Sequence, residues 1–323
     1  MKYRTMGKTG LQVSEIGYGA WGIGSTGWIG ADDAESTKAL HRAMDLGLNF
    51  VDTALGYGDG HSEALVGAVV RQRSEKIHVA TKIPPKNMKW PPQPDIPVQE
   101  VFPARHVIES TEQSLRNLGL ETLDIQQFHV WSDEWCTQGD WLEAILQLKR
   151  QGKIRFFGVS INDHQTDNAI KLIETGLVDT VQVIYNIFEQ SPEDRLLPAC
   201  LRHNVGVIVR VALDEGGLTG KIQADTAFPD GDFRNNYFRG NRKQQVAERV
   251  QNISQALDIG PAQMAETALR FTLSHPAVST VIPGMRSLTN VEKNCAVGDG
   301  RGLPDAQLAE LRSHRWIRNF YQS

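Results

Sequence analysis

Short apolar runs alternate along the chain with stretches whose apolar residues recur every three or four positions. The runs predict β-strands, and the amphipathic stretches between them predict helices. Strands are expected at residues 16–19, 49–52, 77–82, 124–129, 155–160, 180–185, 206–211 and 278–282. Helices are expected at residues 33–46, 61–70, 105–118, 141–151, 165–175, 194–203, 244–257, 263–274, 290–296 and 306–318.

Local signals mark the ends of several of these elements. Asp140, with a glutamate three residues on, predicts a capping box for the helix that follows. Ser191 followed by Pro192 predicts a second helix start. At the N-terminus, two short strands around residues 3–6 and 11–13 flank a Gly-Lys-Thr-Gly turn. We therefore expect a β-hairpin that covers the bottom of the core.

The order of these elements indicates the fold class. Most predicted strands lack polar alternation, as parallel strands flanked by helices do. Eight strand–helix units in 323 residues fit an α/β fold, a (β/α)8 TIM barrel with an N-terminal β-hairpin and a C-terminal extra helix. The alternative, a doubly wound open sheet, predicts a glycine-rich phosphate loop directly after the first strand. The glycines at 17–24 lack the G-x-G-x-x-G spacing, so we expect residues 1–323 to form one barrel domain.

Composition narrows the classes of partner and compartment. The formal charge of -4, from 38 acidic and 34 basic residues, argues against nucleic-acid and anionic-membrane binding. Three widely spaced cysteines suggest a reducing compartment without a disulfide framework, and no metal-type Cys/His spacing occurs. The N-terminus lacks the apolar run of a signal peptide, and no apolar segment is long enough to span a membrane. We expect a cytoplasmic protein that acts on a small molecule.

Ionisable residues stand at the ends of otherwise apolar strands. Asp52, Lys82 and His129 each close a predicted strand, and Tyr57 follows Asp52 on a glycine-bracketed turn. Singly, each has an ordinary explanation: a loop cap, a surface lysine, a buried histidine. Because parallel strands of a barrel end at one rim, these side chains are expected to meet there. Two long segments, 83–103 and 219–240, also follow strands at that rim.

The four side chains suit proton transfer to a carbonyl compound. A phenol with a pKa near ~10 is a poor acid and a poor base at neutral pH. A lysine ammonium nearby favours the phenolate, and Asp52 would keep Lys82 charged and oriented. His129 can donate a hydrogen bond to a substrate oxygen or relay the proton. Such a group can protonate an oxyanion as it forms on a carbonyl.

At these residues the chain resembles the aldo-keto reductase superfamily, almost from end to end. The motifs are Asp52-Thr53-Ala54-x-x-Tyr57-Gly58, Thr81-Lys82, Gln127-x-His129, Gly158-Val159-Ser160, Gly217-Leu218-Thr219-Gly220-Lys221, Ile282-Pro283-Gly284-Met285-Arg286 and Asn294. Each motif is short, but their order and barrel spacing are specific. The resemblance implies reduction of an aldehyde or ketone with NADPH (NADP+), with NADH as a possible substitute, by a monomer or weak homo-oligomer.

The resemblance also assigns residues to roles. Asp52, Tyr57, Lys82 and His129 match the family's catalytic tetrad, with Tyr57 as the general acid. Cofactor contacts are expected at Trp21, Asp52, Ser160, Gln182, Arg210, Leu213, Gly217, Lys221, Gly284, Arg286, Asn290 and Asn294. Ser160 and Gln182 match positions at the nicotinamide carboxamide. Arg286 matches a 2'-phosphate position, where its fork can make two charge-assisted bonds.

Three positions depart from the family pattern. The asparagine expected directly after Ser160 comes one residue later, at Asn162. Arg210 replaces the aromatic residue that stacks on nicotinamide. Its positive charge disfavours the oxidised ring, so we expect Arg210 to shift the relative affinity towards the reduced cofactor. Lys293 stands where the family often has an acid that contacts adenine, which leaves the adenine contacts open.

Five tryptophans follow strand ends or lie in the adjoining loops: Trp21, Trp28, Trp90, Trp131 and Trp135. The predicted substrate contacts are Trp21, Trp90 and Trp131, with Tyr57 and His129. Aromatic walls favour an apolar or aromatic carbonyl compound. Near the C-terminus, we expect Trp316, Phe320 and Tyr321 to pack against the barrel.

Two other functions are compatible with these residues. A Schiff-base aldolase would use Lys82 as its nucleophile, but it leaves Arg286 without a task. A non-catalytic NADPH-binding sensor subunit is the other alternative, because barrels of this family also serve as channel-associated sensors. The intact Tyr57, Lys82 and His129 argue against lost catalysis.

Overall fold

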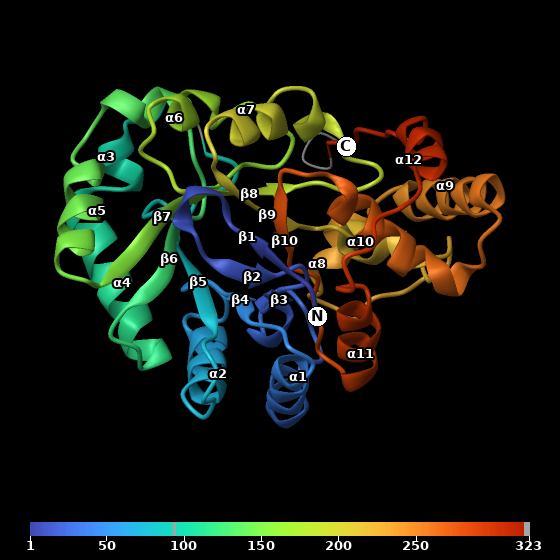
Figure 1. Ribbon diagram of the computed structural model, residues 1–323, viewed down its shortest axis with the longest axis horizontal. Coiled ribbons are helices and arrows are strands. Elements are labelled where there is room, and N and C mark those ends of the chain that lie inside the picture. The colour runs from blue at the N-terminus through green and yellow to red at the C-terminus, as the bar shows by residue number, and fades with distance from the viewer. Residues whose placement is uncertain (93–94, 320–323) are drawn as a thin grey trace.

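Eight parallel strands form the centre of the computed structural model, which describes residues 1–92 and 95–319 (Figure 1). They are β3 (Tyr18–Gly19), β4 (Phe50–Asp52), β5 (His78–Ile83), β6 (Leu123–Phe128), β7 (Ile154–Ser160), β8 (Thr180–Ile184), β9 (Gly206–Arg210) and β10 (Val278–Val281). Each strand pairs with the next in chain order. Two isolated bridges, Ile16 to Val281 and Gly19 to Gly284, join the first strand to the last. The sheet closes on itself, so the predicted (β/α)8 barrel is confirmed and the open sheet is excluded.

The closure depends on a close approach of two backbones at Gly19. Its backbone nitrogen donates to the carbonyl oxygen of Pro283 at 3.1 Å. A β-carbon at Gly19 would lie only 2.5 Å from the carbonyl oxygen of Ile282. A side chain here would push the two strands apart, so this position of the seam requires glycine.

Helices surround the sheet, and the N-terminal hairpin lies across the centre of the view (Figure 1). The helices are α1 (Asp33–Asp45), α2 (His61–Val70), α3 (Val98–Val101), α4 (Ala104–Leu118), α5 (Trp141–Arg150), α6 (Ile170–Glu174), α7 (Leu196–Arg202), α8 (Phe233–Tyr237), α9 (Arg242–Leu257), α10 (Met264–Ser274), α11 (Leu288–Ala296) and α12 (Asp305–Arg312). Short 3-10 helices are η1 (Gly7–Thr9), η2 (Trp21–Ile23), η3 (Asp133–Thr137), η4 (Ser191–Glu193), η5 (Asp214–Thr219) and η6 (Pro261–Gln263). The hairpin strands β1 (Tyr3–Thr5) and β2 (Gln12–Ser14) pair antiparallel, as predicted. Within the described ranges, no helix is both long and apolar enough to cross a membrane.

Two helices are shorter than predicted, and both differences have a physical cause. Helix α6 begins only at Ile170, where the Asp133 carboxylate accepts from the backbone nitrogens of Lys171 and Leu172 at 2.9 and 3.3 Å. Helix α12 ends before the chain turns back, so that the Trp316 backbone nitrogen donates to the carbonyl oxygen of Phe188 at 2.9 Å. The two rings lie 5.4 Å apart, so Trp316 packs as predicted. Phe320 and Tyr321 lie outside the described residues.

The two predicted helix starts are correct in position, but neither side chain caps its helix. Asp140 occupies the N-cap position of α5 but makes no side-chain bond to it, so the capping box is wrong. Its Oδ1 instead accepts from the backbone nitrogen of Ala104, at the start of α4, at 2.9 Å. The 3-10 helix η4 begins at Ser191 with Pro192 in its first turn, and the Ser191 hydroxyl donates to Glu189. In both cases another partner takes the side chain.

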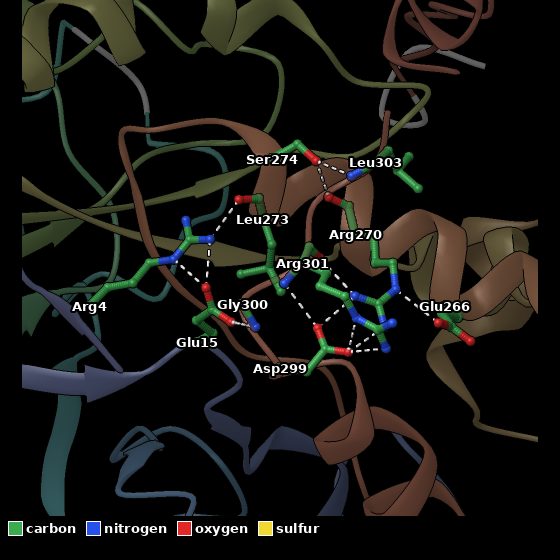
Figure 2. A network of polar contacts seen from close by, with 10 residues as sticks. All are labelled: Arg4, Glu15, Glu266, Arg270, Leu273, Ser274, Asp299, Gly300, Arg301 and Leu303. Carbon is green, nitrogen blue, oxygen red and sulfur yellow. Dashed lines mark hydrogen bonds and ion pairs between the residues drawn. The ribbon is translucent and has the colours of Figure 1, made fainter. Parts of the chain in front are cut away.

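A network of charged residues holds the hairpin and the C-terminal region together at the bottom of the barrel (Figure 2). Arg4 of β1 donates to Glu15 at 2.7 Å and to a backbone carbonyl near the end of α10 at 2.8 Å. Glu15 accepts in turn from the backbone nitrogen of Gly300 at 3.0 Å. Beside it, Arg270 of α10 donates to both oxygens of Asp299, at 2.9 and 3.1 Å. These bonds connect residues from opposite ends of the chain.

We expect Asp299→Asn to lower the free energy of unfolding by about 2 kcal/mol, the scale of hydrogen bonds to charged groups. Hydrogen bonds from Arg270 and Arg301 hold the pKa of Asp299 well below its usual value. A depressed folded-state pKa means that this stabilisation is present above pH ~4 and is lost as the pH falls through the folded-state value. Urea unfolding at pH 7 measures the loss, with Asp225→Asn as an exposed control. Equal stabilities of the two variants would contradict the prediction.

Candidate active site

Inside the barrel, a layer of apolar side chains lies beneath a layer of polar ones. The apolar layer consists of Phe50, Ala80, Ile125, Ile208 and Ile282, packed on residues of the hairpin. Side chains two positions apart on a strand point to the same face. The next inward residues on four of these strands are therefore Asp52, Lys82, Gln127 and Arg210. The two-residue alternation of side chains along the strands therefore places a polar layer at their carboxyl ends, where barrel enzymes have their active sites.

Lys82 is fully buried, and its ammonium group donates to three oxygens. Nζ lies 2.6 Å from Asp52 Oδ2, 2.8 Å from the carbonyl oxygen of Thr53 and 3.1 Å from the Tyr57 hydroxyl. Burial alone would lower the pKa of Lys82. The charges and hydrogen bonds of Asp52 and Tyr57 outweigh burial and raise that pKa. Lys82 therefore stays protonated, with a partner for each of its three N–H bonds.

The second oxygen of Asp52 accepts hydrogen bonds from two glutamines. Gln182 Nε2 lies 2.8 Å from Asp52 Oδ1, and Gln127 Nε2 lies 3.2 Å from it. Gln182 Oε1 is buried and has no hydrogen-bond partner among the residues that the structure describes. Gln127 was absent from the predicted site residues. The sequence feature that could have identified Gln127 is an amide side chain inside an apolar strand, two positions before His129.

Tyr57 reaches Lys82 from the turn that follows β4. Gly58 has a left-handed backbone, with φ of +67°, and a β-carbon there would overlap the carbonyl oxygen of Gly24. The turn therefore packs closely on the loop after β3. Burial raises the pKa of Tyr57, and the positive charge of Lys82 opposes this rise without cancelling it. Lys82 favours the phenolate as expected, yet the hydroxyl keeps its proton at neutral pH.

His129 follows β6 and meets the ring of Tyr57 edge to face. The ring centroids of these two residues lie 5.6 Å apart, and the Trp90 ring lies 5.8 Å from the imidazole. Burial, followed by the charges of Lys82 and Arg210, lowers the pKa of His129 well below its usual 6.5. The imidazole is therefore neutral at pH 7. A neutral imidazole carries one N–H that can donate to a ligand.

Aromatic residues from three segments surround this group. The Trp21 ring stacks near Tyr57, at 6.2 Å, and contacts Phe233 of α8 at 5.1 Å. Trp90 is 41% exposed beside His129. Trp21 and Trp90 therefore lie where the sequence placed them. Phe233 was missed: it begins α8 within the long segment 219–240, whose path the sequence does not reveal.

Trp131 and Trp135 lie elsewhere. Both are fully buried in an aromatic cluster with Phe128 and Trp141, and the Trp131 and Trp141 rings lie 5.2 Å apart. Trp131 Nε1 donates to Asp133 at 2.9 Å. This position contradicts the predicted substrate contact at Trp131. The strand ends at Phe128, so the alternation that would point residue 131 into the barrel no longer holds.

The segment after β9 folds over the loop after β3. The Phe233 backbone nitrogen donates to the carbonyl oxygen of Gly27 at 2.6 Å, and Asp232 accepts from the backbone nitrogen of Ile29 at 3.2 Å. The Arg234 guanidinium lies 4.3 Å from the centre of the Trp28 ring. These contacts fix Trp28 and Phe233 beside Trp21, at the carboxyl end of the barrel.

The positions matched to the nicotinamide carboxamide lie together. Ser160 and Gln182 are paired neighbours on β7 and β8, and both are buried. Asn162 has a different task, because its amide donates to the carbonyl oxygen of Trp131 at 2.8 Å and accepts from the backbone nitrogen of Trp131 at 3.3 Å. Asn162 thus fixes the loop after β6.

Arg210 closes β9 and forms an ion pair that the sequence did not suggest. Its Nη2 lies 2.5 Å from Asp163 Oδ1 and 3.0 Å from the carbonyl oxygen of Ile161. Asp163 comes from the loop after β7, beyond the reach of strand-end patterns. The Asp163 carboxylate therefore partly neutralises the positive charge of Arg210.

The other predicted cofactor residues lie along the same rim in two groups. Leu213, Gly217 and Lys221 lie in and around η5, Gly284 and Arg286 lie between the barrel seam and α11, and Asn290 and Asn294 lie in α11. Arg286 Nη1 donates to the carbonyl oxygen of Ile29 at 3.0 Å, and its guanidinium lies 5.6 Å from the Trp28 ring. Asn294 is buried, whereas Lys221, Asn290 and Lys293 are exposed. Arg286 thus lies at the position matched to a 2'-phosphate, and the adenine contacts stay open.

Similarity to known proteins extends over nearly the whole chain. "Aldo-keto reductase YhdN" of Bacillus subtilis (strain 168) is 29% identical over 306 residues, covering 90% of this chain and 87% of that protein. The "NADH-specific methylglyoxal reductase" of Escherichia coli (strain K12) is 26% identical over 306 residues, covering 92% and 93%. The solved structure of an aldo/keto reductase from Klebsiella pneumoniae in complex with NADP and acetate has a TM-score of 0.70 at 25% identity, covering 99% and 98%. A family model described as "Aldo/keto reductase family" matches residues 15–315, and the chain therefore belongs to this family of oxidoreductases.

Proposed function

We propose that the protein reduces an aldehyde or ketone to an alcohol, with NADPH as the hydride donor and Tyr57 as the general acid. One observation carries the proposal. Lys82 Nζ bonds the Asp52 carboxylate at 2.6 Å and the Tyr57 hydroxyl at 3.1 Å at the same time. Membership of an oxidoreductase family supports the reaction class.

The residues of the rim fit a nicotinamide dinucleotide, which supplies the hydride when bound. The buried Gln182 Oε1, beside Ser160, can accept a hydrogen bond from a carboxamide. Arg286 offers a charged fork for a phosphate at the far end of the rim. The K. pneumoniae relative was solved with NADP, and the E. coli relative is named as NADH-specific. We therefore favour NADPH and keep NADH as a possible substitute.

The mechanism follows from the hydrogen bonds around Tyr57. Its raised pKa makes the phenol a weak acid, which gives up its proton only to the strongly basic oxygen that develops during reduction. Lys82 stabilises the phenolate left behind, and Asp52 keeps Lys82 charged. The neutral imidazole of His129 can hold the substrate oxygen by donating a hydrogen bond, which orients the carbonyl.

The alternatives fit the geometry less well. A Schiff-base lysine must lose its proton and be accessible to substrate. Lys82 is fully buried, is held protonated, and uses all its N–H bonds, so an aldolase is disfavoured. The intact group of Tyr57, Lys82 and His129 argues against a sensor subunit that has lost catalysis.

The surroundings suggest the kind of substrate and the setting. Trp21, Trp90 and Phe233 form aromatic walls near Tyr57, which favours an apolar or aromatic carbonyl compound. The three cysteines are free and buried, which fits a reducing compartment. We place the protein in the cytoplasm, as a monomer or weak homo-oligomer made of one barrel domain.

We expect Tyr57→Phe to lower kcat about 10²–10⁴-fold, because the general acid is lost, while NADPH still binds. The loss of NADPH absorbance with a panel of aldehydes measures turnover. Tyr3→Phe, which removes the phenol of the 43% exposed Tyr3 from the hairpin, is the matched control. If the wild type binds NADPH tightly but turns over no aldehyde, the sensor function replaces this proposal. Borohydride trapping of a carbonyl compound on Lys82 would instead support the aldolase.

We expect Asp52→Asn to lower the free energy of unfolding by about 3 kcal/mol and to reduce kcat, because it leaves the buried Lys82 without its counter-charge. The folded-state pKa of Lys82 is raised, so the stabilisation by the pair is complete below pH ~10 and is lost as the pH rises through the folded-state value. Urea unfolding at pH 7 and at higher pH measures both effects. Asp167→Asn removes a carboxylate from an exposed ion pair with Arg195 and is the control. A stability equal to that of the control would contradict the role of Asp52.

A further inference from the structure

Arg210 places a positive charge in the polar layer of the barrel, and Asp163 balances it. The two side chains are 2.5 Å apart and only 23% and 15% exposed. Water therefore screens their charges less than it would at an open surface. Ile161, which accepts from the same guanidinium nitrogen, directly follows Ser160 of β7. The pair thus lies next to the position proposed for the nicotinamide carboxamide.

The charge of Arg210 reaches the groups of the catalytic site. After burial and Lys82, Arg210 is the third influence that lowers the pKa of His129. Burial raises the pKa of Tyr57, and Arg210 is among the charges that oppose this rise. A ligand bound between these residues is exposed to the same charge.

We propose that the Asp163–Arg210 pair sets the relative affinity of the protein for oxidised and reduced nicotinamide, with Asp163 acting through Arg210 as a positioning residue. The inference rests on the proposed function, since it requires a nicotinamide ring beside Ser160. The oxidised ring carries one positive charge and the reduced ring carries none. An unbalanced Arg210 repels only the oxidised ring, and Asp163 weakens that repulsion. The preference for the reduced cofactor expected from Arg210 alone is thereby diminished.

The test is a double-mutant cycle on cofactor affinity. Dissociation constants for NADP+ and NADPH are measured by quenching of protein fluorescence for the wild type, Asp163→Asn, Arg210→Met and the double variant. We expect Asp163→Asn to raise the ratio Kd(NADP+)/Kd(NADPH) about tenfold, equivalent to about 30 mV in the potential of the bound two-electron couple. Arg210→Met should lower the ratio. In the Arg210→Met background, Asp163→Asn should raise the ratio less than it does in the wild type, because only the direct charge of Asp163 is then lost and no Arg210 is released from its position.

The controls separate a charge effect from damage to the fold. Asp167→Asn removes a carboxylate from the same loop, four residues on, and should leave the ratio unchanged. A structural defect would weaken binding of both cofactors and leave the ratio of their dissociation constants unchanged. The double variant, which has neither charge, shows whether both cofactors still bind when no charge is left unpaired. An unchanged ratio in Asp163→Asn, or an equal effect with and without Arg210, would overturn the proposal. If the wild type binds neither cofactor, the proposed function fails and this inference fails with it; tight binding of both with an unchanged ratio overturns the inference alone.

Discussion

A protonated lysine inside an apolar barrel is the constraint on which the candidate active site depends. Lys82 is tolerated there because Asp52 supplies a counter-charge at 2.6 Å and two further oxygens complete its hydrogen bonds. Asp52 is itself held by Gln127 and Gln182. The polar layer is therefore a connected network, and its members fix one another's positions. Tyr57 joins this network from the turn after β4, and its hydroxyl is protonated at neutral pH.

The convergence of Asp52, Lys82 and His129 could be predicted from the sequence for the same physical reason as the barrel. Parallel strands end at one rim and side chains alternate with period two, so polar residues that close apolar strands must converge. The substrate contact predicted at Trp131 was wrong, because side-chain alternation ends where the strand ends. Asp163 and Phe233 were not predicted, since Asp163 lies in the loop after β7 and Phe233 begins the short helix α8, and the positions of both depend on tertiary contacts.

The predicted helix caps show a related limit. Asp140 carries the local signature of a cap, yet it bonds the start of α4 rather than its own helix. Asp133 caps α6 from a loop more than thirty residues earlier in the chain. A carboxylate satisfies whichever backbone nitrogens the fold brings near it, and the sequence shows only the nearest candidates. Element positions were therefore predicted better than element ends.

The seam of the barrel has a consequence for how the protein is made. Its bridges join Ile16 to Val281 and Gly19 to Gly284, and the network below them joins Arg4 to the end of α10. These contacts link segments that lie far apart in the sequence. During translation, the edge of β3 stays unpaired until β10 has left the ribosome, and an unpaired edge is open to association with other chains. Closure of the barrel is thus a late event, governed by the most distant contacts in the sequence.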